Sequence, residues 1–210
     1  MGMNTPQGYL LVVEDVSDIL VLLNETLKFK GYRVITARNG VEALEQIDKE
    51  HPALIITDIL MPKMDGFSLV HRLRLDPKTR NIPIIFLSAT YVAPEDKAFA
   101  LTIGVTRFIE KPVDLENFFP VIDELLVQKE TAIPELLDEV GFYDGYRKRL
   151  ESKLKHKNTQ IARDENLLKT LTGGERASFE ASLRQSKTER EEIQQLLEQI
   201  RDRLDELKPE

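Results

Sequence analysis

The first part of the chain alternates between short apolar runs and segments with helical periodicity. Runs rich in valine, isoleucine and leucine predict strands at 9–13, 32–36, 53–57, 82–87 and 105–109. The segments between and after them predict helices at 17–30, 39–50, 66–75, 94–103 and 114–128. Continuous apolar strands that alternate with helices are typical of a parallel sheet covered by helices on both faces. The pattern therefore predicts one α/β domain over 9–128, preceded by a flexible, polar segment at 1–8.

From Phe142 onward the pattern is that of long helices with narrow apolar stripes. The first stripe consists of Tyr143, Tyr146, Leu150, Leu154, Ile161, Leu168 and Leu171. The second consists of Phe179, Leu183, Ile193, Leu197, Ile200, Leu204 and Leu207. Stripes this narrow are typical of coiled-coil seams. We therefore predict two long helices at about 142–171 and 175–207, after a linker at 129–141 that contains one or two helical turns.

The dipeptide Gly173-Gly174 interrupts the helical pattern and favours an antiparallel hairpin, with one continuous, kinked helix as the alternative. If the chain turns there, residues whose numbers sum to about 347 face each other across the seam. Lys157 then faces Arg190. Two like charges in a seam are unfavourable unless an acid such as Glu189 answers them or both heads reach water.

Composition excludes several classes of protein. The chain has no cysteine, so it has neither disulfides nor thiolate metal sites. No apolar run approaches the ~20 residues that a membrane span needs. Residues 1–8 lack the apolar core of a signal peptide, so we expect a cytoplasmic protein.

Charge separates the two halves of the chain. Residues 1–140 contain 14 basic and 22 acidic side chains, a net charge of −8, whereas residues 141–210 contain 15 and 14, a net charge of +1. An acidic first half repels nucleic-acid phosphates, which argues against nucleic-acid binding there.

Polar side chains follow four of the predicted strands. Glu14 and Asp15 follow the first strand, Asp58 the third, Ser88 the fourth, and Lys111 the fifth. Carboxyl ends of parallel strands meet at one edge of an open sheet, where such folds place their sites. The spacing therefore predicts one site that contains all five side chains.

The residue types at this edge indicate phosphate chemistry. A carboxylate such as Asp58 can attack phosphorus and form an acyl phosphate. Three neighbouring acids repel one another, and a divalent cation removes that conflict. Oxygen ligands and a phosphate partner favour Mg²⁺ over softer metals. A lysine supplies a point charge for phosphoryl oxygens.

Residues 9–128 resemble the receiver domain of two-component response regulators. The matching residues are Glu14-Asp15, Asp58, Met61-Pro62, Met64-Asp65-Gly66, Ser88-Ala89, Phe108 and Lys111-Pro112. The resemblance implies a doubly wound, five-stranded parallel sheet with strand order 2-1-3-4-5. It also implies that the peptide bond between Lys111 and Pro112 is cis.

The resemblance assigns a role to each site residue. Asp58 is the phosphoacceptor and binds Mg²⁺ together with Asp15, while Glu14 acts through water. The backbone carbonyl of Leu60 completes the protein ligands, and the backbone N–H groups of Ile59 and Ala89 bind the phosphoryl group. Lys111 pairs with the phosphoryl oxygens. Ser88 and Phe108 form the switch: the hydroxyl moves toward the phosphoryl group and the aromatic ring then turns inward.

These roles imply a phosphoacceptor signalling protein that catalyses only its own phosphorylation and dephosphorylation. Its partner is a histidine kinase or a phosphotransfer protein. We expect the long helices to act on an unknown output protein and to form a homodimer, because two hairpins cover their stripes better as a four-helix bundle. Pro120 within the last predicted helix of the domain should bend that helix or delay its start.

Two other functions are open for residues 142–210. The basic segment at 147–157 would allow a DNA-binding transcription regulator, although acidic residues follow at once and we do not expect nucleic-acid binding. His156 on a helical bundle would allow a phosphorelay protein.

Overall fold

The computed structural model describes residues 8–88, 94–127, 137–170 and 174–207. Their contacts divide the chain into two compact units, Met1–Leu136 and Leu137–Glu210. Within the described residues no helix has both the length and the apolar character needed to cross a bilayer.

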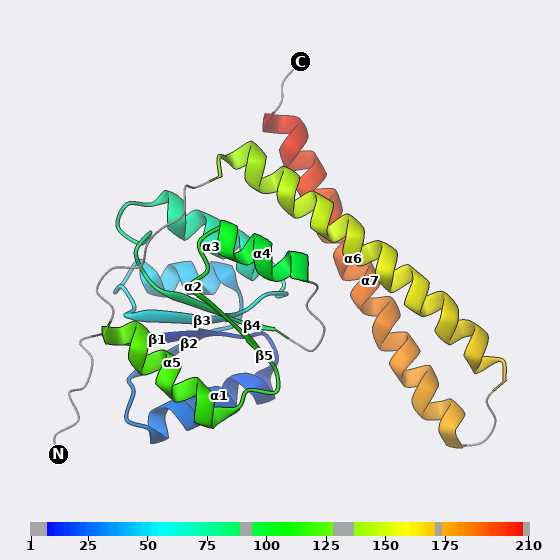
Figure 1. The fold of residues 1–210 in the computed structure, drawn as a ribbon, viewed down its shortest axis with the longest axis horizontal. Coiled ribbons are helices and arrows are strands. Elements are labelled where there is room, and N and C mark those ends of the chain that lie inside the picture. Colours follow the sequence, from blue (N-terminus) through cyan, green and yellow to red (C-terminus); the bar gives the residue numbers. More distant parts are fainter. Residues whose placement is uncertain (1–7, 89–93, 128–136, 171–173, 208–210) are drawn as a thin grey trace. The chain divides into compact units, whose positions relative to one another are not determined.

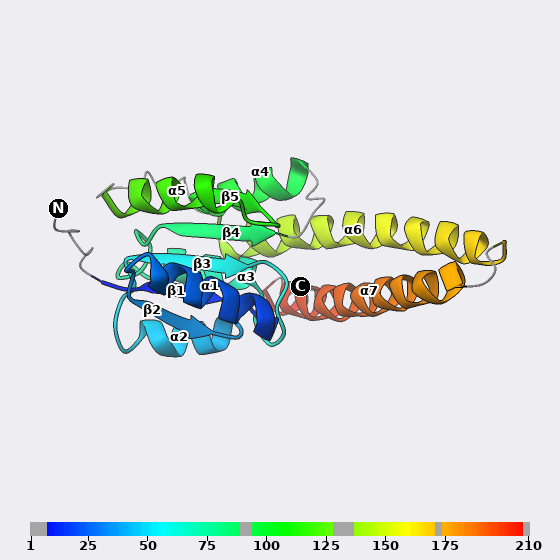
Figure 2. The ribbon, with the colours of Figure 1, turned by 90° about the horizontal axis from the view of Figure 1, so that it is seen from below.

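The first unit contains a five-stranded parallel sheet. Its strands are β1 (Leu10–Val13), β2 (Val34–Ala37), β3 (Leu54–Asp58), β4 (Ile84–Ser88) and β5 (Arg107–Glu110). They lie in the order β2-β1-β3-β4-β5 (Figure 2). The predicted strand order is therefore confirmed.

Five helices cover the sheet. They are α1 (Ser17–Phe29), α2 (Gly40–Ile47), α3 (Gly66–Leu75), α4 (Pro94–Thr102) and α5 (Leu115–Val127). Helices α1 and α5 lie on one face, and α2, α3 and α4 lie on the other (Figure 1). Because both faces are covered, residues on both sides of the inner strands are buried, which explains why β1 is apolar throughout and β4 is apolar up to its last residue, Ser88.

The predicted bounds differ from these mainly at the ends of elements. The second strand begins at Val34 rather than at residue 32, and α2 ends at Ile47 rather than at residue 50. Ends of strands and helices fray, and apolar patterns do not mark the residue at which backbone pairing stops.

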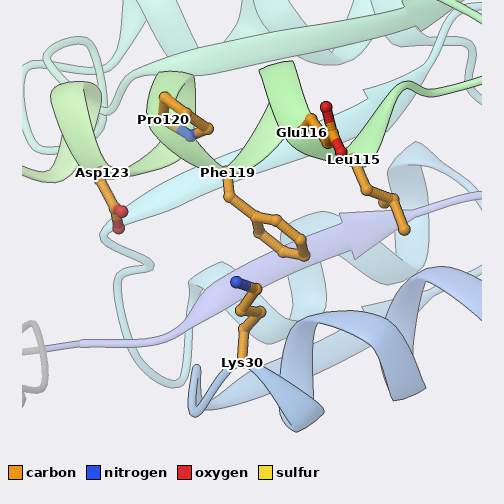
Figure 3. Close-up of a pocket in the computed structure, with 6 residues that line it drawn as sticks. All are labelled: Lys30, Leu115, Glu116, Phe119, Pro120 and Asp123. Carbon is orange, nitrogen blue, oxygen red and sulfur yellow. The ribbon is translucent and has the colours of Figure 1, made fainter.

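Helix α5 runs through Pro120 without a delayed start. Asp114 accepts a hydrogen bond from the backbone N–H of Glu116 at 3.1 Å and so caps the first turn. Of the two predicted effects of Pro120, the delayed start is therefore wrong, because this cap fixes the beginning of the helix ahead of the proline, and the bend stays a prediction. Pro120 borders an open hollow of about 440 Å³, where the ammonium of Lys30 lies 4.6 Å from the ring centroid of Phe119 (Figure 3).

The second unit is an antiparallel hairpin of α6 (Glu139–Leu168) and α7 (Gly174–Leu207), which lie side by side in Figures 1 and 2. The hairpin prediction is thus confirmed over the continuous helix. Helix α6 begins three residues earlier than predicted, because Asp138 accepts a hydrogen bond from the backbone N–H of Gly141 at 2.7 Å. Residues 128–136 of the predicted linker lie outside the described residues.

Apolar side chains and ion pairs hold α6 to α7. The buried apolar side chains are Phe142, Tyr146, Leu150, Ile161, Leu183, Ile193, Leu197, Ile200 and Leu204. Ion pairs between the helices include Lys157–Glu189 at 2.8 Å, Lys187–Glu165 at 2.6 Å, Arg201–Glu151 at 2.9 Å and Arg203–Glu139 at 2.7 Å. The residue numbers of these pairs sum to between 342 and 352, around the predicted value.

In the seam between α6 and α7, the polar residue Lys157 pairs with an acid. Lys157, whose side chain is 18% exposed, donates a hydrogen bond to Glu189 rather than facing Arg190 without an answering acid. Arg190 lies 3.7 Å from Glu191. The predicted clash of like charges is therefore relieved in the way that the sequence allowed.

We expect a double-mutant cycle on Lys157→Met and Glu189→Gln to give a coupling energy of about 0.5–1 kcal/mol, since this pair is partly shielded from water. The matched cycle on Lys187→Met and Glu165→Gln should give about 0.2–0.5 kcal/mol, because both of those side chains are more than two-fifths exposed. Thermal unfolding followed by circular dichroism measures both. Equal coupling energies would show that the seam does not shield Lys157.

Candidate functional site

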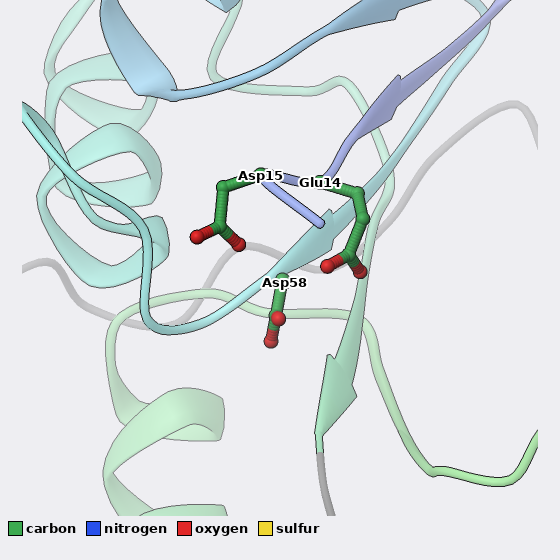
Figure 4. A group of neighbouring side chains, drawn as sticks. All are labelled: Glu14, Asp15 and Asp58. Atoms are coloured by element: carbon green, nitrogen blue, oxygen red, sulfur yellow. The ribbon is translucent and has the colours of Figure 1, made fainter. Parts of the chain in front are cut away.

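Three carboxylates gather at the carboxyl ends of β1 and β3. Strand pairing places Val13 beside Thr57, so Glu14 and Asp58 leave neighbouring strands at the same level. Oxygen atoms of Glu14, Asp15 and Asp58 all lie within 4.8 Å of one another (Figure 4). Glu14 is fully buried, and Asp15 is accessible to solvent. The structure thus brings together the three acids that the sequence predicts to share a site.

Lys111 reaches this cluster from the segment after β5. Its Nζ donates hydrogen bonds to Oε2 of Glu14 at 2.7 Å and to Oδ2 of Asp58 at 2.9 Å. The side chains of Lys111 and Asp58 are 15% and 17% exposed. One ammonium therefore bridges the buried carboxylate of Glu14 and the slightly exposed carboxylate of Asp58.

For Glu14 and for Lys111, burial and the neighbouring opposite charge shift the pKa in opposite directions. Burial raises the pKa of the Glu14 carboxyl, although the hydrogen bond from Lys111 lowers it in part. Burial also raises the pKa of Asp15. Burial lowers the pKa of Lys111, but hydrogen bonds and charges of Glu14 and Asp58 outweigh it and hold that pKa above its ordinary value. Lys111 is therefore charged at neutral pH.

Ser88 and Phe108 lie on the two strands next to the cluster. Ser88 is the last residue of β4, is 8% exposed, and accepts a backbone hydrogen bond from Lys111 at 2.6 Å. Phe108 on β5 is half-buried, and its ring meets the ring of Phe86 edge-on at a centroid distance of 6.3 Å. Ser88 is thus on the strand between that of Asp58 and that leading to Lys111, and Phe108 is on the strand that leads to Lys111.

The backbone groups predicted to bind phosphate or metal are described only in part. The N–H of Ile59 donates to Oδ1 of Asp58 at 2.6 Å. Leu60 follows in the same loop, with its side chain 37% exposed. Ala89 lies outside the described residues. The peptide bond from Lys111 to Pro112 is cis, as the resemblance implies.

Two residues that support Asp58 were not assigned a role from the sequence. A Cβ atom on Gly66 would lie 2.4 Å from the backbone carbonyl oxygen of Asp58, so only glycine fits there. Thr57, which is fully buried, donates a hydrogen bond to the same carbonyl at 2.8 Å. The Asp65-Gly66 sequence was a signal for this close approach, whereas nothing in the apolar pattern distinguishes Thr57.

The donor set of the cluster fits a hard divalent cation. Three carboxylates and one ammonium leave a formal charge of −2 in a shielded site. All of the acidic ligands offer oxygen, which Mg²⁺ prefers. The side chains present are therefore suited to Mg²⁺ and a phosphoryl group.

Comparison with known proteins decides the family. A response regulator receiver domain matches residues 10–123, which is somewhat more than half of the chain. The chain belongs to the response regulator receiver family.

Relatives share the receiver domain over different portions of their length. A 14.6 kDa protein of Leptolyngbya boryana is 42% identical over 105 residues, which cover 50% of this chain and 79% of that protein. The response regulator PleD of Caulobacter vibrioides is 36% identical over 126 residues, which cover 55% of this chain but only 28% of PleD. The chemotaxis response regulator CheY4 of Vibrio cholerae has a similar structure, with a TM-score of 0.52 and 32% identity over 56% of this chain and 98% of that one.

In the basic segment beyond the receiver domain, Arg147, Lys148 and Lys157 pair with acids. Arg147 bonds Asp144 at 2.8 Å and lies 3.7 Å from Glu151, and Lys148 bonds Asp144 at 2.8 Å. His156 is exposed on α6. The pairing leaves less positive charge for nucleic acid than the sequence suggests, and both alternative functions of this segment remain predictions.

We expect Lys111→Met to raise the pKa of Glu14 further, because the substitution removes the hydrogen bond that now opposes the effect of burial. Carbon-13 NMR of the side-chain carboxyl groups during a pH titration without metal measures this. Arg33→Met is the matched control. It removes the exposed partner of Glu50 and should raise the pKa of that carboxyl while leaving Glu14 unchanged. An unchanged Glu14 titration in Lys111→Met would contradict the bridging role of Lys111.

Proposed function

We propose that this receiver domain accepts a phosphoryl group on Asp58 from a phosphohistidine of a histidine kinase or phosphotransfer protein. The observation that carries the proposal is the ammonium of Lys111, which bonds Glu14 and Asp58 at once beside the carboxylate of Asp15. A shielded carboxylate beside a fixed positive charge is suited to attack an anionic phosphoryl group.

Atoms and charge balance in the transfer. A carboxylate oxygen of Asp58 forms a bond to phosphorus as the bond from phosphorus to the imidazole nitrogen of the donor breaks. The imidazole keeps the electron pair and takes up a proton from solvent. Lys111 exchanges its contact with Asp58 for one with a phosphoryl oxygen, which places a cation where negative charge collects.

The acidic residues supply the metal ligands in this proposal. Asp15, Asp58 and the backbone carbonyl of Leu60 would bind Mg²⁺ directly, and Glu14 would act through water. Bound Mg²⁺ offsets the repulsion between the carboxylates and the phosphoryl oxygens.

Phosphorylation then shifts the domain between two states. The hydroxyl of Ser88 donates to the phosphoryl group in one of them, and Phe108 turns inward in the same state. The output is the α6–α7 hairpin, which acts by protein–protein contacts.

We expect Asp58→Asn to abolish phosphorylation by acetyl phosphate in the presence of Mg²⁺, because an amide cannot replace the carboxylate as nucleophile. Intact-protein mass spectrometry detects the added phosphoryl group, and hydroxylamine should release it as expected of an acyl phosphate. Asp48→Asn, an exposed acid at the end of α2, should label like the parent protein. Labelling of Asp58→Asn at the parent level would refute the assignment.

We also propose that the chain forms a homodimer through the hairpin, as a four-helix bundle. Much of the apolar seam is already buried in the structure, and Leu167 is the one large apolar side chain exposed among the described hairpin residues. The bundle therefore depends on partly exposed seam residues such as Leu154 and Phe179.

Light scattering with Mg²⁺, with and without beryllofluoride as a phosphoryl mimic, measures the solution mass. We expect a dimer in both conditions, so that phosphorylation changes its shape. A monomer in both conditions would defeat the bundle and leave the hairpin for a different partner.

A further inference from the structure

Four phenylalanine rings form a continuous chain from β5 to α4. The ring of Phe108 meets Phe86 of β4 at 6.3 Å between centroids, and Phe86 meets Phe67 of α3 at 5.2 Å with the ring planes at 89°. Phe67 in turn lies 5.4 Å from Phe99 of α4. Each step is within the 4.5–7 Å over which aromatic pairs attract one another.

The strand register places this chain on the face of the sheet that carries α3 and α4. Phe86 pairs with Thr57 on one side and with Phe108 on the other, so these three residues lie in one row across the sheet. Ile85, Leu87 and Ile109 alternate with them and belong to the core beneath α1 and α5. The row that begins beside Asp58 therefore leads through the rings to α4.

The inner rings have no room to move independently. Phe86 is fully buried and Phe67 is 4% exposed, while Phe108 and Phe99 at the two ends are half-buried. Close-packed side chains shift between discrete arrangements rather than deforming gradually. A shift of Phe108 against Phe86 would therefore be passed on to Phe67.

The carboxyl end of α4 is held by a separate, polar contact. Arg74 of α3 is 3% exposed and donates to the carbonyl of Gly104 from Nε at 3.1 Å and from Nη2 at 2.8 Å. Gly104 has a φ of 95° and ends α4, with its N–H bonded to Leu101 and that of Val105 bonded to Ala100. A two-pronged hydrogen bond from a buried arginine fixes this end more firmly than a single bond would.

We propose that Phe108, Phe86, Phe67 and Phe99 link the Asp58 site to α4, and that the Arg74–Gly104 contact is the fixed point about which α4 changes position. The proposal deepens the proposed function, on which it rests, by naming the residues that carry the signal from the site to a surface helix. Phe67 and Phe99 act as positioning residues, since neither is among the residues of the acidic site.

A tryptophan placed on α4 reports on this movement. The chain contains no tryptophan, and Leu101 is 48% exposed on α4, so Leu101→Trp introduces a single tryptophan, which can be excited at wavelengths where the tyrosines do not absorb. With Mg²⁺ and beryllofluoride its fluorescence should change. Adding Phe67→Leu or Phe99→Leu should reduce that change about fivefold or more if the rings carry the coupling. Fluorine-19 NMR of the bound beryllofluoride measures site occupancy independently.

Phe118→Leu is the matched control. Phe118 is also buried, at 1% exposure, but it belongs to α5 and packs into the core on the opposite face of the sheet. It should leave the fluorescence change intact. Because Phe99 is only half-buried, Phe99→Leu also covers the case in which the buried Phe67 variant fails to fold.

The two assays separate the possible failures. Full occupancy with an unchanged fluorescence response in both ring variants would overturn the link and leave the Asp58 site standing. Full occupancy of Leu101→Trp with no response, or loss of the response in Phe118→Leu as well, would also overturn it. If beryllofluoride does not bind to Leu101→Trp, the proposed function itself fails, and the link fails with it.

Discussion

The contact of one ammonium with the buried carboxylate of Glu14 and the partly buried carboxylate of Asp58 constrains the rest of the receiver domain. Glu14 is fully buried and negative charge there is costly, so the fold must deliver Lys111 to within hydrogen-bond distance. Glu14 follows β1, Asp58 ends β3, and Lys111 follows β5. The open parallel sheet, with these strand ends on one edge, brings the three groups together from distant positions in the sequence.

The site was predictable because strand ends can be read from apolar runs. Once the strands are parallel, the end of each run fixes where its polar neighbour lies, which is why Asp15, Ser88 and the bridged residues were all assigned to one edge. The contacts beneath the site were not predictable in this way. The contact between the rings of Phe67 and Phe99 depends on which way two separate helices turn these side chains. The hydrogen bond of Arg74 to Gly104 joins residues that no local sequence pattern connects.

Helix boundaries show the same division between local and distant causes. Local capping by Asp138 and Asp114 sets the starts of α6 and α5, although the apolar pattern of the sequence does not indicate either cap. The pairing of Lys157 with Glu189, by contrast, depends on the hairpin register, which the sequence gives only to within a few residues. Propensity and periodicity therefore located the elements, and side-chain hydrogen bonds decided where they begin.

The charges along the hairpin carry a consequence for selectivity. Three of the ion pairs between its helices place the acid on α6 and the base on α7: Glu139–Arg203, Glu151–Arg201 and Glu165–Lys187. Two α6 helices set side by side would bring those acids into proximity, and two α7 helices would do the same for the bases. Like charges across a helix pair repel, so the pattern discriminates against self-pairing of either helix. The charges on each helix thus favour pairing with the other helix over pairing with a copy of itself.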